Sequence, residues 1–281
     1  MLKKFNFLGM LITFNYFYSF IIGSCIGSFI NVVIYRFPNN LSIIKPRSFC
    51  PKCKTKLTLR ENIPLISWLI QKGRCINCST SISKRYPLIE LITAILFVVF
   101  INSSPSLFNY SSNLFFNIFF SWLFLSLLIC ITFIDIESFW IPQGLINFGF
   151  ISGLFCLIFI GLFNNKFIDF YLLARGVSAS AISFFIFESI RYSTKYIYKK
   201  DAIGKGDSKL VAMLALWLGP TGILFAVGIS YIFAGIYCLV GLSFNLVRFK
   251  QFIPFAPFLS LGGLFIWLVG NEFVINKILR I

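Results

Sequence analysis

The 281-residue sequence contains no histidine and only nine acidic residues. Without histidine, neither a Ser-His-Asp triad nor a Cys-His pair can form, and an H-E-x-x-H metalloprotease helix is excluded as well. The phosphate-binding pattern G-x-x-x-x-G-K-[ST] is also absent. Acid–base chemistry in this chain must therefore depend mainly on a few carboxylates.

Charged residues of both signs make up only 12% of the chain, whereas hydrophobic residues make up 58% and the mean hydropathy is +0.87. A soluble domain has about 25% charged residues, so the lipid bilayer is the main solvent here. About 20 apolar residues span a bilayer as a helix. We therefore predict an all-α polytopic membrane protein with about eight transmembrane helices, at 12–34, 87–103, 114–134, 145–163, 170–190, 209–220, 222–247 and 255–270.

Two of these spans need comment. The first could be mistaken for a signal peptide, but no small-residue cleavage site follows it, so we expect it to remain in the mature chain. The sixth is short and the seventh long, with Gly219-Pro220 between them.

The net charge of +16 is concentrated in a few loops. Between Arg36 and Arg85 lie nine lysines and arginines and one acid, Glu61, and the loops at 191–208 and 248–250 are also basic. With eight spans, these loops lie on one side of the membrane, and the positive-inside rule makes that side cytoplasmic. Because the charge pattern reports topology, we expect contact with membrane lipid and no nucleic acid.

Half of the eight cysteines form two C-x-x-C pairs in the largest basic loop, "CPKC" and "CINC". Two such turns can supply the four thiolates of a structural zinc site, although the stretch between them is a residue longer than usual. Two disulfides or redox motifs are the alternatives, which a reducing cytoplasm and the lack of a βαβ pattern disfavour. We predict a closed zinc site that stabilises this charged loop, with the ligands Cys50, Cys53, Cys75 and Cys78.

Among the acids, Asp135 and Asp207 are the candidates for catalysis. Asp135 ends the third span and Asp207, in "GKGDSKL", opens the sixth, so the topology places both at a similar depth on the cytoplasmic side. If they meet, one carboxyl keeps its proton while the other ionises, as in aspartic proteases. Taken singly, each could be a solvated helix end, and Asp207 could be a helix cap.

The glycines that precede Asp207 suggest a special turn. We expect Gly204 and Gly206 to adopt backbone conformations closed to other residues, and to let a substrate backbone approach without a Cβ in the way.

In these motifs the sequence resembles the type IV prepilin peptidases, which are related to presenilin-type GxGD proteases. "GSCIGSFINVVIYRFP" (23–38) is similar to the N-terminal signature of the family, and "PFAPFLSLGG" (254–263) to its C-terminal one. Asp135 and Pro142 reproduce a D-x₆-P spacing, and "GKGDSKL" matches G-x-G-D-x-K-L. The chain departs from the family at Gln143, usually Asp or Asn, and at Ala256, usually Gly.

The resemblance implies a bacterial inner-membrane aspartic endopeptidase. Such an enzyme cleaves the leader of type IV prepilins or pseudopilins on the cytoplasmic side with Asp135 and Asp207, and N-methylates the new N-terminus with S-adenosylmethionine as methyl donor. It also implies that residues 1–86, the first helix and the zinc loop, are associated with methyl transfer, and that 87–281 form the peptidase domain. No motif identifies the residues that bind the methyl donor.

Two other functions stay open at this point. Asp135 and Asp207 could serve an ion-coupled transporter, although the sequence shows no internal repeat of the kind that transporters often have. A non-catalytic assembly protein could use the zinc loop for docking.

Overall fold

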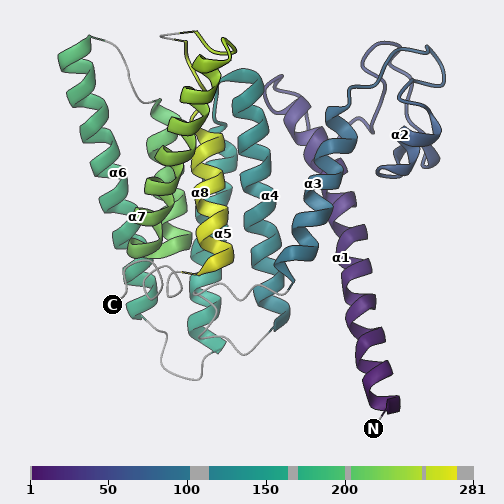
Figure 1. Ribbon diagram of the computed structural model, residues 1–281, viewed down its shortest axis with the longest axis horizontal. Coiled ribbons are helices and arrows are strands. Elements are labelled where there is room, and N and C mark those ends of the chain that lie inside the picture. The colour runs from purple at the N-terminus through teal and green to yellow at the C-terminus, as the bar shows by residue number, and fades with distance from the viewer. Residues whose placement is uncertain (1, 102–113, 164–169, 200–203, 249–250, 271–281) are drawn as a thin grey trace. The chain divides into compact units, whose positions relative to one another are not determined.

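A computed structural model describes residues 2–101, 114–163, 170–199, 204–248 and 251–270 (Figure 1). Within these ranges there is no β-strand, only two isolated bridges in the cysteine-containing loop. The helices are α1 (Leu2–Arg36), η1 (Arg60–Asn62), α2 (Ile66–Ile70), α3 (Arg85–Phe100), α4 (Leu114–Ser138), α5 (Gln143–Phe163), α6 (Phe170–Tyr198), α7 (Lys205–Ser243) and α8 (Ala256–Val269).

The predicted all-α membrane fold is confirmed. Of the described helices, α1, α4, α5, α6 and α7 are long and apolar enough to cross a membrane, and α8 is a shorter apolar helix. The predicted sixth and seventh spans are both parts of α7.

Gly219 divides α7 into two arms, because its φ of 71° and ψ of 178° are not helical and Pro220 follows. Tyr231 in the second arm lies close enough to Asp207 in the first for the carboxylate charge to act on the phenol. In a straight helix, 24 residues would separate them by about 36 Å. The second arm therefore folds back along the first, as two separate spans would.

The chain forms two compact units, Met1–Ser103 and Ser104–Ile281, called here the N-terminal and C-terminal units. α3 belongs with α1 in the N-terminal unit. We predicted a functional division after residue 86, and that division stays a prediction, but the compact units divide after Ser103.

In the N-terminal unit, α1 packs against α3 through the small residues of "GSCIG". A Cβ added to Gly23 or Gly27 would lie 2.7 Å from the Cα of Ala94 or Glu90, respectively. Such a glycine pair, four residues apart, lets two membrane helices approach closely. The Asn31 side chain joins them by donating to the Tyr86 carbonyl at 3.1 Å.

In the C-terminal unit, aromatic side chains fix α4, α7 and α8 against one another. The ring of Phe124 lies 4.9 Å from that of Trp217 and 4.8 Å from that of Trp267, centroid to centroid. The Trp217 indole also donates to the Gly149 carbonyl of α5 at 2.9 Å. These contacts give the helices that carry the candidate site a rigid support.

Candidate active site

Asp135 lies one turn before the end of α4, and it is only 5% exposed. Its Oδ2 accepts a hydrogen bond from the N–H of Ala256, the first residue of α8, at 3.2 Å. Ala256 is one of the departures from the family pattern, and its contact with the carboxylate uses the backbone rather than the side chain. With alanine at this position, the backbone N–H still donates a hydrogen bond to Asp135.

Asp207 is the third residue of α7, where its carboxylate caps the helix. Its Oδ2 accepts the Gly204 N–H at 3.1 Å, and the Asp207 N–H donates to the Gly204 carbonyl at 3.1 Å. The structure thus agrees with the alternative interpretation of Asp207 as a helix cap. It does not exclude a second role, because Asp207 also lies close enough to Asp135 for the two charges to interact.

The structure therefore brings together the two acids that the sequence singled out. Asp135 lies in the last turn of α4, and Asp207 lies in the first turn of α7. Figure 1 shows the end of α4 and the start of α7 at the same end of the helices.

Our expectation for the glycines of "GKGD" was wrong in one respect. Gly204 has a φ of −67°, and Gly206 is not among the residues with positive φ, so neither needs a conformation closed to other residues. Gly206 instead permits a close approach, since a Cβ there would lie 2.9 Å from the Cβ of Ile141. Ile141 belongs to the short connection between α4 and α5, so Gly206 seats α7 against the segment that follows Asp135.

A polar contact joins the same two segments. The Lys209 ammonium of α7 donates to the Gln143 Oε1 at the start of α5. The Gln143 amide nitrogen in turn donates to Asn147 at 2.8 Å. Gln143, the other departure from the family pattern, thus still provides a side-chain oxygen to the lysine of G-x-G-D-x-K-L.

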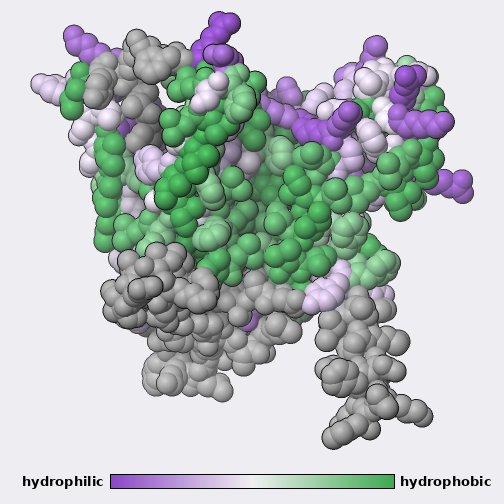
Figure 2. Space-filling model, in the orientation of Figure 1, coloured by the Kyte–Doolittle hydropathy of each residue, from purple (hydrophilic) through white to green (hydrophobic). Residues whose placement is uncertain are grey.

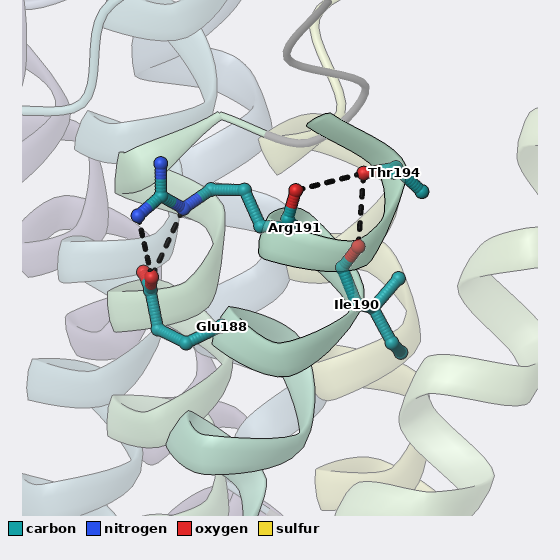
Figure 3. Close-up of polar contacts among 4 residues, drawn as sticks. All are labelled: Glu188, Ile190, Arg191 and Thr194. Atoms are coloured by element: carbon teal, nitrogen blue, oxygen red, sulfur yellow. Dashed lines mark hydrogen bonds and ion pairs between the residues drawn. The ribbon is translucent and has the colours of Figure 1, made fainter. Parts of the chain in front are cut away.

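A third carboxylate near the start of α7 is neutralised by its own helix. Glu188 of α6 accepts two hydrogen bonds from the Arg191 guanidinium, at 3.0 and 2.6 Å (Figure 3). The two side chains are only 16% and 7% exposed. The charge of Glu188 is therefore balanced by the ion pair with Arg191. Among the described carboxylates of the C-terminal unit, Glu188 is thus held in an ion pair and Glu137 is exposed, whereas Asp135 is buried and Asp207 is partly buried.

The four predicted metal ligands converge in the N-terminal unit. The Sγ atoms of Cys50, Cys53, Cys75 and Cys78 all lie within 4.8 Å of one another, and those of Cys50 and Cys78 are 3.8 Å apart. A tetrahedral Zn–S₄ centre with bonds of about 2.3 Å has sulfur atoms about 3.8 Å apart. The four thiols therefore fit a zinc ion.

The two C-x-x-C turns have the same local structure. In the first, the Cys50 carbonyl accepts the Lys54 N–H and the Cys50 N–H donates to Thr55; in the second, Cys75 makes the same bonds with residues 79 and 80. The sequence encodes this repeat as C-x-x-C-x-T, in "CPKCKT" and "CINCST". Sequence reasoning overlooked the threonines.

These threonines contact the second cysteine of each pair. The Thr55 hydroxyl donates to Cys53 Sγ at 3.2 Å, and Thr80 Oγ1 lies 3.2 Å from Cys78 Sγ. Hydrogen bonds from the hydroxyl and backbone of Thr80 lower the pKa of the Cys78 thiol to about 6, and those of Thr55 lower the pKa of Cys53. At Cys78, the thiolate that a metal requires is thus favoured at neutral pH.

Glu90 is a second group whose role the sequence did not reveal. A carboxylate near the start of a helix, as Glu90 is in α3, can complement the helix dipole. Glu90 is instead buried, and its Oε2 accepts the N–H of Leu65, the residue before α2, at 2.8 Å. Glu90 therefore connects the cysteine-containing loop to α3. Only the long-range packing could show this, because the two residues are 25 positions apart.

Comparison with known proteins agrees with this organisation. Residues 21–103 match the family model described as "Bacterial Peptidase A24 N-terminal domain", and residues 122–239 match "Type IV leader peptidase family". No solved structure matches the chain at a significant level.

Named relatives extend over most of the chain. A "Type 4 prepilin-like proteins leader peptide-processing enzyme" of Escherichia coli is 33% identical, over 86% of this chain and 89% of the relative. A "Prepilin leader peptidase/N-methyltransferase" of Myxococcus xanthus is 34% identical over 79% of this chain, which spans 62% of that protein. One of Bacillus subtilis is 32% identical, over 91% of this chain and 94% of the relative.

The fold and the sites thus define a polytopic helical membrane protein with two aspartates at the same end of its helices and a four-cysteine cluster. The chain belongs to the type IV leader peptidase family. The resemblance seen in the sequence motifs is confirmed.

Proposed function

We propose that this protein cleaves the leader peptide from type IV prepilins or related pseudopilins with Asp135 and Asp207, and then N-methylates the new N-terminus. The observation that carries the peptidase proposal is the convergence of the two aspartates, whose charges interact although they are 72 positions apart in the sequence. The relatives' names supply the substrate class and the methyl transfer.

The reaction uses the two carboxyl groups in different protonation states. The ionised carboxylate takes a proton from water, whose oxygen attacks the carbonyl carbon of the scissile peptide, while the protonated carboxyl donates a hydrogen bond to the carbonyl oxygen. The C–N bond then breaks, and the amine nitrogen takes up the proton that the carboxylate had removed from water. Because two like charges held close together do not both ionise easily, we expect the pair to share one proton and to titrate as a unit.

The backbone hydrogen bonds of the two aspartates are compatible with one carboxylate acting as a base and the other as a hydrogen-bond donor. Oδ2 of Asp135 accepts the Ala256 N–H, and Oδ2 of Asp207 accepts the Gly204 N–H. In our proposal these bonds orient each carboxylate, and the Oδ1 atoms serve water and the substrate. Gly206 and the Lys209–Gln143 bond keep α7 seated against the segment that follows Asp135.

The substrate fits the location. A prepilin has an apolar helix and a basic leader, so its cleavage site lies where the membrane meets the cytoplasm. The positive-inside pattern supports a location of the aspartates on that side of a bacterial inner membrane.

The N-terminal unit is the candidate for the methyl transfer, in which S-adenosylmethionine supplies the methyl group. The zinc ion would be held by Cys50, Cys53, Cys75 and Cys78, and would have a structural role because all four positions are filled by protein. Ion-coupled transport and passive assembly are less well supported, since all the relatives reported above are processing enzymes or methyltransferases by name.

Reconstitution tests the proposal directly. The purified protein is incubated in detergent with a prepilin, with or without S-adenosylmethionine, and the mass of the N-terminal peptide of the product is measured. We expect loss of the leader in both cases, and one added methyl group only when the methyl donor is present. An uncut prepilin with the folded, zinc-loaded protein would contradict the proposed function.

A further inference from the structure

The cysteine-containing loop carries an apolar surface that neither proposed reaction uses. Around α2, large apolar side chains are between 42% and 85% exposed: Leu59, Ile63, Ile66, Leu69 and Ile70. Apolar residues gathered outside a core mark a surface that binds something. Figure 2 shows a hydrophobic surface on the lobe at α2, with hydrophilic residues around and above it.

The bond between Glu90 and Leu65 fixes the level of α2 along α3. Glu90 lies five residues after Arg85, the first residue of α3, and five residues correspond to about 7.5 Å along a helix axis. The start of α2 is therefore held at the level of Glu90, in the apolar part of α3, and not at the level of Arg85. At this level Leu88 and Leu91 of α3 are themselves 49% and 44% exposed.

The backbone at the start of α2 supports the same placement. Leu65 has a φ of 62° and a ψ of −51°, which is an uncommon conformation for a bulky residue. Its N–H is the one that Glu90 accepts, so the buried carboxylate holds the turn that brings residues 66–70 to α3.

The charge of the loop identifies the kind of surface that α2 meets. Residues 36–85 include eleven lysines and arginines and one acid. Arg60 and Lys72, which flank the apolar segment, are both exposed. Apolar side chains bordered by basic ones are typical of segments that lie in the interface of a membrane with anionic lipids.

We propose that residues 59–72 form an interfacial membrane anchor. Ile63, Ile66, Leu69 and Ile70 insert among the lipids of the leaflet on the side of the cysteine cluster, and Arg60 and Lys72 bind anionic headgroups. The anchor holds the zinc lobe against the membrane surface, where the new N-terminus of a cleaved substrate would emerge. The anchor depends on the membrane fold, and it does not depend on the aspartate chemistry.

Photocrosslinking of the whole protein in nanodiscs tests the anchor. p-Benzoylphenylalanine replaces Leu69 or Ile70, and, as a control, the exposed Lys52 of the first C-x-x-C turn. The nanodiscs contain phosphatidylethanolamine and phosphatidylglycerol, and mass spectrometry counts lipid adducts after illumination. We expect about tenfold more lipid adducts at 69 and 70 than at 52, because only the anchor enters the lipid.

Other outcomes would overturn the anchor. Equal adduct yields at all three positions would show that α2 does not enter the bilayer. Crosslinks from 69 or 70 to residues 104–281 or to a prepilin would show that the apolar surface binds protein instead. If replacing phosphatidylglycerol by phosphatidylcholine leaves the adducts at 69 and 70 unchanged, the assignment of Arg60 and Lys72 to anionic headgroups is wrong.

A second set of variants separates the anchor from the function and from misfolding. With the photocrosslinker at Ile66, the additional changes Leu69→Gln and Ile70→Gln should lower the lipid adducts several-fold, while zinc content is unchanged. Adducts that persist undiminished would contradict the anchor. Prepilin cleavage is assayed on the same preparations, so a failure of the peptidase proposal is seen independently of the lipid result.

Discussion

The N-terminal and C-terminal units position their polar groups by different physical means. In the C-terminal unit, Asp135 and Asp207 are carried by helices that large aromatic rings and a closely fitted glycine hold in place. In the N-terminal unit, the four cysteines lie on a loop with one five-residue α-helix and two isolated β-bridges, and their arrangement depends on local turns and on a metal. One site should therefore respond to changes in helix packing, and the other to metal removal.

Substitution of the aspartates should have the largest effect. We expect Asp135→Asn or Asp207→Asn to lower prepilin cleavage by about 100-fold to 10,000-fold, because each removes a group required for proton transfer. The zinc content, which depends on the other unit, should not change. Gel-based cleavage assays with purified protein and metal analysis measure the two effects.

Glu137→Gln is the matched control for these variants. Glu137 is on the same helix two residues after Asp135 and is exposed, so its substitution should leave cleavage close to the wild-type rate. Full cleavage by an Asp135→Asn or Asp207→Asn variant would remove the pair from the mechanism.

Loss of the metal should affect the activity assigned to the N-terminal unit more than that assigned to the C-terminal unit. We expect Cys50→Ser or Cys75→Ser to abolish stoichiometric zinc binding and to lower methylation more than cleavage, because a structural zinc site provides folding free energy to its own loop. Cys25→Ser, on the same unit but outside the cluster, should retain zinc. An equal loss of cleavage and methylation would show that the units are not independent.

A methyl group added at Gly206 should damage the aspartate site by packing alone. Gly206→Ala puts a Cβ against Ile141, and overpacking of this kind costs about 1–3 kcal/mol. We expect cleavage to fall by roughly tenfold to a hundredfold, and the change Ile141→Ala in the same chain to restore part of it. Gly228→Ala should be harmless, since nothing lies within 4 Å of a Cβ there. An unaffected Gly206→Ala variant would argue against a close fit at this position.

The smallest expected effect concerns the threonines beside the cysteines. Thr80→Val removes the hydroxyl that keeps the pKa of Cys78 at about 6, so the pKa should rise toward its usual value. Protons then compete better for the thiolate, and zinc should be released at a higher pH than in the wild-type protein. Groups that contact metal ligands contribute about tenfold to a hundredfold to metal affinity.

Chelator competition across a pH series measures this effect. Thr80→Ser, which keeps the hydroxyl, should behave like the wild-type protein. If Thr80→Val retains zinc over the same pH range as the wild-type protein, the hydroxyl has no part in the site.

The sequence predicted the parts of this molecule that depend on local composition. Hydropathy located the helices, C-x-x-C pairs located the metal ligands, and the scarcity of acids drew attention to Asp135 and Asp207. Contacts that depend on distant residues could not be predicted. The hydrogen bonds of Glu90 to Leu65 and of Ala256 to Asp135, and the fit of Gly206 to Ile141, arise from how helices pack, which no periodicity reports.

The central claim is that Asp135 and Asp207 form one site, and crosslinking of paired cysteines tests it most directly. Asp135→Cys and Asp207→Cys are combined in a chain whose Cys25, Cys130, Cys156 and Cys238 are replaced by serine or alanine, while zinc protects the cluster. We predict an intramolecular crosslink with a short bifunctional thiol reagent in membranes, and a much weaker one when Glu137→Cys takes the place of Asp135→Cys. No crosslink between positions 135 and 207 in the folded protein would contradict the account.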